Sequence, residues 1–203
     1  MNKDLATEER IFKAARKVFQ QRGLQGSRMQ EIAEVAGIHR SVLNYYYRTK
    51  KKLYDEVVKR TVKEVVPRYK RSFVAAQSTR EILEGLIHAF FDQYAQEPEL
   101  ATFYAITLQE NPELIFEILE EYNFDAVLEL FNQWVEQAIQ KGEIRNVNPR
   151  FLLGNINSMC AYPFISRPMI LRNMTEDGMS EEAFFNGLKE EIVTLVWNGI
   201  KKD

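Results

Sequence analysis

Two short helical segments joined by a glycine turn lie between Met29 and Leu53, near the start of the chain. In the first segment, apolar residues recur at spacings of three and four, which places them on one face of an α-helix. Gly37 ends that helix. A second helix is predicted over about 40–47, with Leu43 and Tyr47 four residues apart and facing inward. This pattern predicts a helix-turn-helix. The apolar residues of the first short helix are Met29, Ile32, Ala33 and Ala36.

Longer helices are predicted on both sides of this motif. A first helix over about 5–21 has one apolar stripe and stops at Gly23, a residue that commonly ends helices. Ser27 is expected to cap the first short helix, with Gln30 completing a capping box three residues later. Thr49 starts a long fourth helix, in which Pro67 marks a bend or the hand-over to a second domain.

The outward side chains of the segment 40–47 are suited to contact DNA. A helix fits the major groove, where arginine pairs with guanine and asparagine with adenine through two hydrogen bonds. Lys50 begins the next helix, a position that favours a phosphate. The outward set is Arg40, Ser41, Val42, Asn44, Tyr45 and Tyr46.

The charge of the chain is unevenly distributed. Its formal net charge is only −2. Residues 1–72 hold 18 Lys and Arg against 8 Asp and Glu, a charge of +10, and residues 73–203 hold 9 against 21, a charge of −12. A basic end on an acidic body is the layout of a protein that presents that end to a polyanion, although chance clustering on solvated helix faces gives the same sums.

A pattern of small, apolar and basic residues runs in one register through the first two helices, the turn and the start of the fourth helix. Its members are Arg10-Ile11, Ala14-Ala15, Phe19, Gly23, Ser27, Ile32-Ala33, Ala36-Gly37-Ile38, Leu43, Tyr45, Tyr47, Lys50 and Leu53. With this pattern, residues of about 10–54 resemble the DNA-binding domain of the tetracycline-repressor (TetR/AcrR) family of bacterial regulators. The departures are His39, where Ser or Thr is common and caps the recognition helix, Ser41 in place of a frequent Gly, and Asn44 in place of a frequent Tyr.

The resemblance implies a particular organisation. Gln30 and the outward set of the recognition helix would face the groove, and Lys50 would hold a phosphate. Double-stranded DNA with a palindromic operator is the expected partner. The second domain would hold a cavity for a small, largely apolar inducer, and its two C-terminal helices would pair with those of a second copy in a four-helix bundle.

The rest of the chain is also read as helical, over about 79–96, 98–121, 123–141, 149–172 and 180–201. The expected fold class is all-α with about nine helices. The expected domains are a helix-turn-helix DNA-binding domain over 1–49, a connecting helix over 50–72, and a ligand-binding and dimerisation domain over 73–203.

Aromatic residues of the second domain are mostly core, but cavities are lined by such side chains with a few polar anchors. The candidate pocket residues are His88, Tyr94, Phe103, Tyr104, Asn155 and Met159. The last helix is apolar over most of its circumference, and such surfaces usually mark an interface. The candidate dimer residues are Phe164, Phe185, Ile192 and Val196.

Catalysis, metal binding and secretion are not indicated. The two histidines, His39 and His88, lie in different expected domains, and no Gly-rich phosphate loop is present. Cys160 is the one cysteine, so no internal disulfide forms, and we expect it to be buried. With no apolar leader or membrane span, the expected compartment is the cytoplasm, and we expect no metal, no cofactor and no enzymatic activity.

The sequence therefore predicts a ligand-responsive transcriptional regulator, a repressor released from its operator by a small molecule. A non-specific DNA-binding protein, or a dimeric interaction protein without an inducer, is the alternative. Its binding would fall steeply with salt and show no sequence preference.

Overall fold

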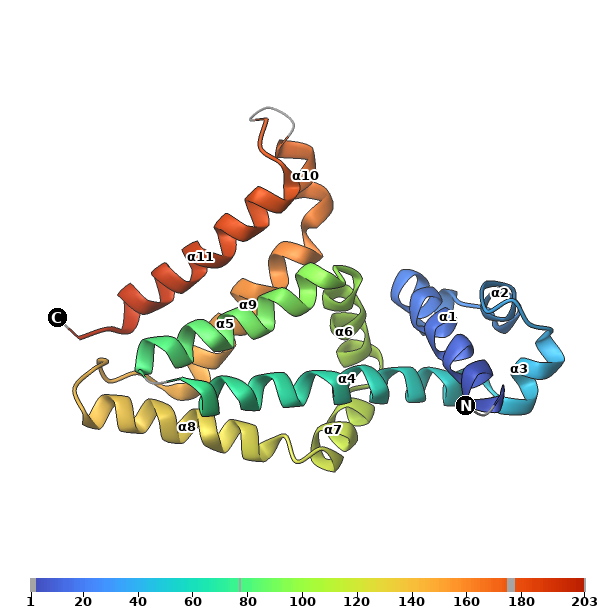
Figure 1. Ribbon diagram of the computed structural model, residues 1–203, viewed down its shortest axis with the longest axis horizontal. Helices are drawn as coiled ribbons and strands as arrows, with labels where there is room; N and C mark the ends of the chain where they lie inside the picture. Colours follow the sequence, from blue (N-terminus) through green and yellow to red (C-terminus); the bar gives the residue numbers. More distant parts are fainter. Residues whose placement is uncertain (1–2, 77, 175–177, 203) are drawn as a thin grey trace. The chain divides into compact units, whose positions relative to one another are not determined.

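The computed structural model describes residues 3–76, 78–174 and 178–202, and these form helices joined by turns, without a named strand (Figure 1). The all-α fold class is therefore confirmed. The helices are α1 (Lys3–Gly26), α2 (Met29–Val35), α3 (Arg40–Tyr46), α4 (Lys50–Ala75), α5 (Thr79–Gln96), α6 (Glu99–Glu110), α7 (Pro112–Glu121), α8 (Asp125–Gln140), α9 (Pro149–Ile165), α10 (Arg167–Met174) and α11 (Glu181–Ile200).

The helix count exceeds the expected nine because two predicted helices are each divided. Pro112 is the first residue of α7, and α6 ends at Glu110. Proline has no N–H to continue the hydrogen bonds of α6, and it disfavours a helical conformation at Asn111 before it. Ser166 separates α9 from α10: it leaves the helical conformation at φ −91° and ψ 8°. Its hydroxyl donates to the Tyr162 carbonyl, 3.0 Å away.

The chain divides into two compact units. The first unit holds residues 1–64 and 102–119, and the second holds residues 65–101 and 120–203. The whole helix-turn-helix segment belongs to the first unit, while α4 and α6 each have residues in both. Within the described ranges, no helix is long and apolar enough to span a bilayer.

A buried tyrosine joins three helices of the first unit. The ring of Tyr54 on α4 meets Phe19 of α1 edge-on at 5.0 Å between centroids, and Phe103 of α6 at 5.7 Å. Its hydroxyl shares a hydrogen bond of 2.6 Å with Thr107, whose own hydroxyl donates to the Phe103 carbonyl. Both hydroxyls in this core therefore have hydrogen-bond partners. The Tyr54–Thr107 bond also connects residues 102–119 to the helices that carry the helix-turn-helix.

The core of the second unit is aromatic and lies where α5, α9 and α11 pack side by side (Figure 1). Phe164 and Phe185 stack with centroids 4.8 Å apart, and Phe91 meets Phe164 at 5.0 Å. Cys160 is fully buried, as expected, and its burial raises the pKa of the thiol to about 12.

This packing corrects the expected dimer residues. All four are buried in the core of a single protomer, because the apolar side of α11 is used against α5 and α9. They are Phe164, Phe185, Ile192 and Val196.

Candidate nucleic-acid interface

The short helix α3 is seated on its scaffold by one side chain and exposes most of the others. Leu43 is 0% exposed, whereas Tyr45 is 84% exposed. The expectation for Tyr47 was partly wrong: α3 ends at Tyr46, and Tyr47 follows in an extended conformation, half-buried. The outward residues are, as predicted, exposed; they are Arg40, Ser41, Val42, Asn44 and Tyr45.

The turn between α2 and α3 is held by a side chain from α1. Arg10 donates to the Ala36 carbonyl through Nε at 3.3 Å and through Nη2 at 2.8 Å, and from Nη2 to the Gly37 carbonyl at 2.9 Å. Gly37 has φ +62°, a conformation that side chains other than glycine rarely adopt. The guanidinium satisfies carbonyls that the end of α2 leaves without intrahelical partners, and this fixes where α3 begins.

The start of α2 differs from the expected capping box. The N-cap is Arg28, which makes no side-chain cap, and the Ser27 hydroxyl donates instead to the Leu24 carbonyl at 2.9 Å. The end of α1 therefore uses the hydroxyl that was expected to cap α2. Gln30 is exposed and donates to Glu34 at 2.9 Å, within its own helix.

Lys50 has a structural partner in addition to its predicted phosphate role. Its ammonium donates to the Ser27 carbonyl at 2.9 Å and to the Gln25 carbonyl at 3.4 Å. It therefore links the start of α4 to the segment between α1 and α2. Thr49 caps α4 as expected for a helix start, accepting from the Lys52 amide at 3.2 Å.

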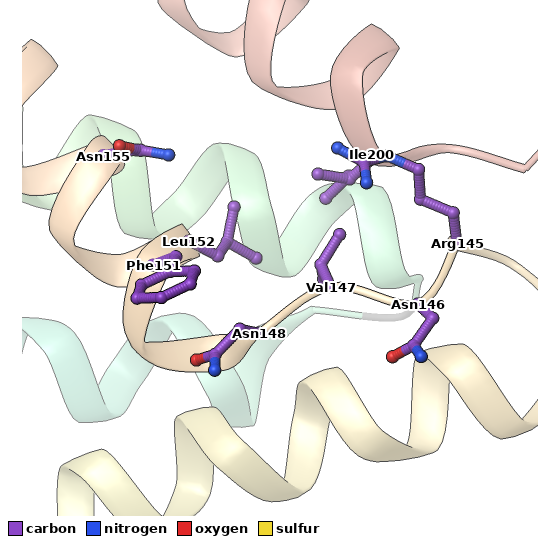
Figure 2. Close-up of a pocket in the computed structure, with 8 residues that line it drawn as sticks. All are labelled: Arg145, Asn146, Val147, Asn148, Phe151, Leu152, Asn155 and Ile200. Carbon is purple, nitrogen blue, oxygen red and sulfur yellow. The ribbon is translucent and has the colours of Figure 1, made fainter.

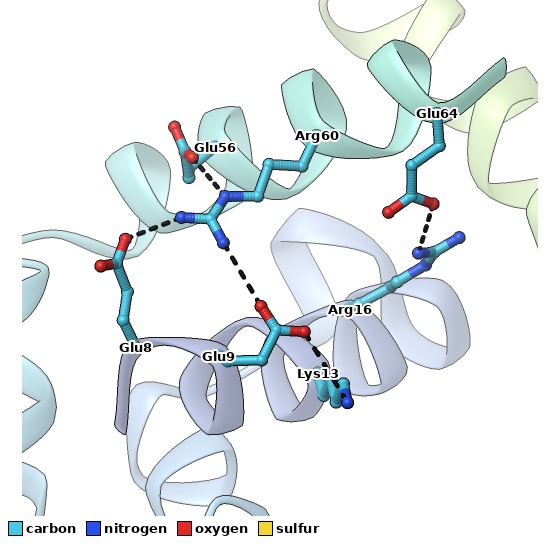
Figure 3. Close-up of polar contacts among 7 residues, drawn as sticks. All are labelled: Glu8, Glu9, Lys13, Arg16, Glu56, Arg60 and Glu64. Atoms are coloured by element: carbon cyan, nitrogen blue, oxygen red, sulfur yellow. Dashed lines mark hydrogen bonds and ion pairs between the residues drawn. The ribbon is translucent and has the colours of Figure 1, made fainter. Parts of the chain in front are cut away.

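An ion-pair network joins α1 to α4 (Figure 3). Arg60 lies 2.7 Å from Glu8, 2.6 Å from Glu56 and 3.7 Å from Glu9. Burial, together with the nearby negative charge of Glu8, raises the pKa of Tyr47 to about 12. A second pair, Arg16 with Glu64 at 3.0 Å, lies further along both helices (Figure 3).

Asp4, Arg28 and Arg48 of this surface were not singled out in the sequence, and Arg10 was named only as part of the family resemblance. Arg10 and Asp4 act on partners 26 or more positions away, which no local pattern signals. Arg28 and Arg48 are exposed beside the two short helices and have no ion-pair partner among the described residues, so both are free to meet phosphates. The sequence feature that could have identified Arg28 and Arg48 is their position at the boundaries of the two short helices.

The recognition helix lacks a side-chain cap, as the sequence suggested. His39 is its N-cap, with φ −71° and ψ 145°, and its imidazole accepts no backbone hydrogen bond there. Two other features hold this helix instead of a cap. One is the burial of Leu43, and the other, the Arg10 clamp, is the set of hydrogen bonds from Arg10 to the Ala36 and Gly37 carbonyls.

The six candidate pocket residues are not brought together. Phe103 and Tyr104 belong to the first unit, and the other four belong to the second. Within the second unit, Tyr94 is buried against Phe164 at 5.8 Å between ring centroids, whereas Asn155 and Met159 are exposed on α9. His88 lies 3.2 Å from Glu190 of α11.

Two clefts of the second unit are large enough for a small molecule. One of about 310 Å³ includes the predicted Asn155 and the exposed ring of Phe151 at the start of α9, together with Arg145 and the end of α11 (Figure 2). Another of about 340 Å³ is lined partly by Phe164 and Phe185. In the described part of the chain, no three His, Cys, Asp or Glu side chains are grouped to hold a metal ion.

The geometry of the first unit defines a class of protein. A seven-residue helix, fixed by Leu43 and by the clamped turn, presents arginine, asparagine and tyrosine side chains without any acidic residue of its own. This is the arrangement of a helix-turn-helix DNA-binding protein.

Comparisons with known proteins agree with this class. Residues 11–57 match the model of the bacterial regulatory proteins of the tetR family. The transcriptional regulator RutR of Escherichia coli K12 is 21% identical over 199 residues, covering 97% of this chain and 91% of RutR.

Solved structures share the fold over the whole chain. The ketosteroid regulator KstR2 of Mycobacterium tuberculosis superposes with a TM-score of 0.73 at 20% identity, covering 98% of this chain and 96% of KstR2. FadR of Bacillus subtilis, solved with stearoyl-CoA, superposes with a TM-score of 0.67 at 20% identity, covering 95% and 98%.

Residues 11–57 are therefore a DNA-binding segment of the tetR type, and the protein is a DNA-binding transcriptional regulator. The relatives that it matches are regulators rather than enzymes.

Replacing the clamp residue tests the seating of α3. We expect Arg10→Ala to lower the free energy of unfolding by about 1–2 kcal/mol in urea titrations, because hydrogen bonds from a charged donor to two carbonyls are lost. Lys13→Ala is the matched control, since Lys13 is exposed and makes one ion pair of 3.7 Å on its own helix. Equal midpoints for the two variants would contradict the clamp.

Proposed function

We propose that this protein is a homodimeric repressor that acts in the cytoplasm, binds a palindromic operator through α3 and is released by a small, largely apolar molecule. The observation that carries the proposal is the exposed face of α3. It combines an arginine and an asparagine, the two side chains that read guanine and adenine bidentately, on a helix that is fixed by its own scaffold.

The position of these two side chains supports direct base reading. Arg40 and Asn44 are four residues apart, so they share one side of α3. Both are exposed and neither has a hydrogen-bond partner among the described residues, so neither must break a protein contact before it meets a base. Arg28, Arg48 and Lys52 are exposed just before α2, just after α3 and in the first turn of α4, and they would supply phosphate contacts.

A duplex selected from random sequence by the full-length protein tests base reading. We expect Arg40→Ala and Asn44→Ala each to weaken binding to the selected duplex by about 1–3 kcal/mol, roughly 5- to 150-fold, and to relax preference at one base position. Binding to a scrambled duplex should change little after Asn44→Ala. Fluorescence anisotropy at physiological salt measures both affinities.

The matched control is Lys17→Ala, which removes one exposed charge from α1. If wild-type protein bound the selected and scrambled duplexes equally, or if all substitutions acted alike, the non-specific alternative would hold instead. That alternative has its own signature, a steep fall of all binding with salt.

Control by an apolar ligand is supported by the second unit and by its structural neighbours. KstR2 is described as a ketosteroid regulator, and FadR is solved with stearoyl-CoA. The cleft on Phe164 and Phe185 offers an aromatic floor of the kind that binds apolar molecules. Both α4 and α6 have residues in both units, so a ligand that displaces either helix in the second unit would move backbone that continues into the unit of the helix-turn-helix. Release of the selected duplex by stearoyl-CoA or a ketosteroid is the corresponding assay.

Dimerisation is supported by apolar side chains that the protomer leaves uncovered. Tyr162 on α9 is 61% exposed, Met169 on α10 is 60% exposed, and Leu195 on α11 is 55% exposed. No residue of α10 is buried within the protomer. Exposed apolar surface on three successive helices of one unit is typical of an interface. To bind half-sites one helical turn apart, an isologous dimer would need its two copies of α3 about 34–36 Å apart.

Charged substitutions test this interface. We expect Tyr162→Asp and Leu195→Asp each to convert a dimer into a monomer at micromolar concentration, because a carboxylate would be buried against the partner without compensation. Phe116→Asp is the matched control, since Phe116 is 62% exposed but lies on α7. Sedimentation equilibrium measures the mass; a monomeric wild type, or dimers for both variants, would contradict the proposal.

A further inference from the structure

The three consecutive tyrosines around the end of α3 have different surroundings. The Tyr45 ring projects from the protein and contacts the Tyr46 ring edge-on at 5.5 Å between centroids. The Tyr46 hydroxyl donates to Oδ1 of Asp4 at 3.1 Å and bonds the side chain of Thr7, both on α1. Tyr47 is half-buried, and its hydroxyl lies in the field of the Glu8 carboxylate on the same helix. The hydroxyl of Tyr46 is therefore bonded directly to α1, whereas that of Tyr45 is not.

The hydrogen bond to Asp4 occupies the proton of the Tyr46 hydroxyl. A phenol has a single proton to donate, so a hydroxyl that donates to a carboxylate cannot also donate to a phosphate. Partial desolvation and the carboxylate of Asp4 raise the pKa of Tyr46, so this proton stays in place at neutral pH. Tyr45, by contrast, has no hydrogen-bond partner for its hydroxyl in the described part of the chain.

Asp4 is an unexpected residue at the edge of a DNA-binding surface. Its carboxylate would repel nearby phosphates, so its charge alone would weaken binding. Its contact with Tyr46 has the opposite effect, because it fixes the C-terminal end of a helix of only seven residues against the much longer α1. The N-terminal end of α3 is held by the Arg10 clamp, so α1 holds both ends.

We propose that Asp4 is a positioning residue for DNA recognition, which acts through the Tyr46 hydroxyl, and that Tyr45 is the tyrosine of α3 that contacts the DNA. This proposal rests on the proposed function. It replaces the sequence-based expectation that Tyr45 and Tyr46 both contact the groove with a division of roles between them.

The test uses the full chain and the duplex that it selects from random sequence. Asp4→Ala removes both the charge and the hydrogen-bond acceptor, whereas Asp4→Asn removes the charge and keeps an acceptor oxygen. Tyr46→Phe removes the donor. We expect Asp4→Ala and Tyr46→Phe each to weaken binding by about three- to tenfold, their combination to weaken it no further, and Asp4→Asn to bind at least as tightly as the wild type. Tyr45→Ala should weaken binding more than Tyr46→Phe.

Two results would overturn the proposal. Tighter or unchanged binding by Asp4→Ala would show that Asp4 acts only by repulsion. Losses from Asp4→Ala and Tyr46→Phe that add in the double variant would show that the Tyr46 hydroxyl contacts DNA by itself. If the wild type selects no duplex, the proposed function fails and this proposal fails with it; if the wild type selects one and Arg40→Ala weakens it, only the positioning role is in question.

Discussion

The burial of Leu43 is the contact on which the recognition surface depends. A helix of seven residues is too short to be stable in water by itself, so α3 persists because its one buried side chain and its two ends are held by other helices. Arg10 fixes the turn before it, and the hydrogen bond of Tyr46 to Asp4 on α1 fixes its end. The side chains that remain are exposed because nothing in this scaffold covers them.

The same scaffold links the motif to the body of the protein. Arg60 on α4 bonds Glu8 on α1, and the charges of both residues act on the half-buried hydroxyl of Tyr47 after α3, so a displacement of α4 would change the electrostatics at the end of α3. The Tyr54 hydroxyl bonds Thr107 on α6 at the buried side of the same unit. Both α4 and α6 continue into the second unit. The ligand control that we propose would therefore act through these contacts.

The sequence predicted this surface well where helical periodicity decides the outcome. The inward place of Leu43 and the exposure of Arg40, Asn44 and Tyr45 follow from spacing along α3 alone. Contacts between distant positions were not predictable in this way. Ser27 was expected to cap α2, but the end of α1 competes for its hydroxyl, a choice that depends on how the two helices meet.

The second unit was predicted less completely, since its apolar residues could belong to a core, a pocket or an interface. Phe164 and Phe185 were assigned to an interface, yet they stack inside the protomer because α5 and α9 cover that side of α11. The apolar composition of α11 alone does not say whether another helix of the protomer or a second copy covers each of its sides. Tertiary packing decided this, and it left Tyr162, Met169 and Leu195 exposed instead.

Hydrogen–deuterium exchange of the full chain, with and without its selected duplex, tests the central claim most directly. If α3 is the part that enters the groove, the duplex should slow exchange most in peptides spanning residues 37–48, with smaller effects at the start of α2. Slower exchange confined to the second unit, with residues 37–48 unchanged, would contradict the account.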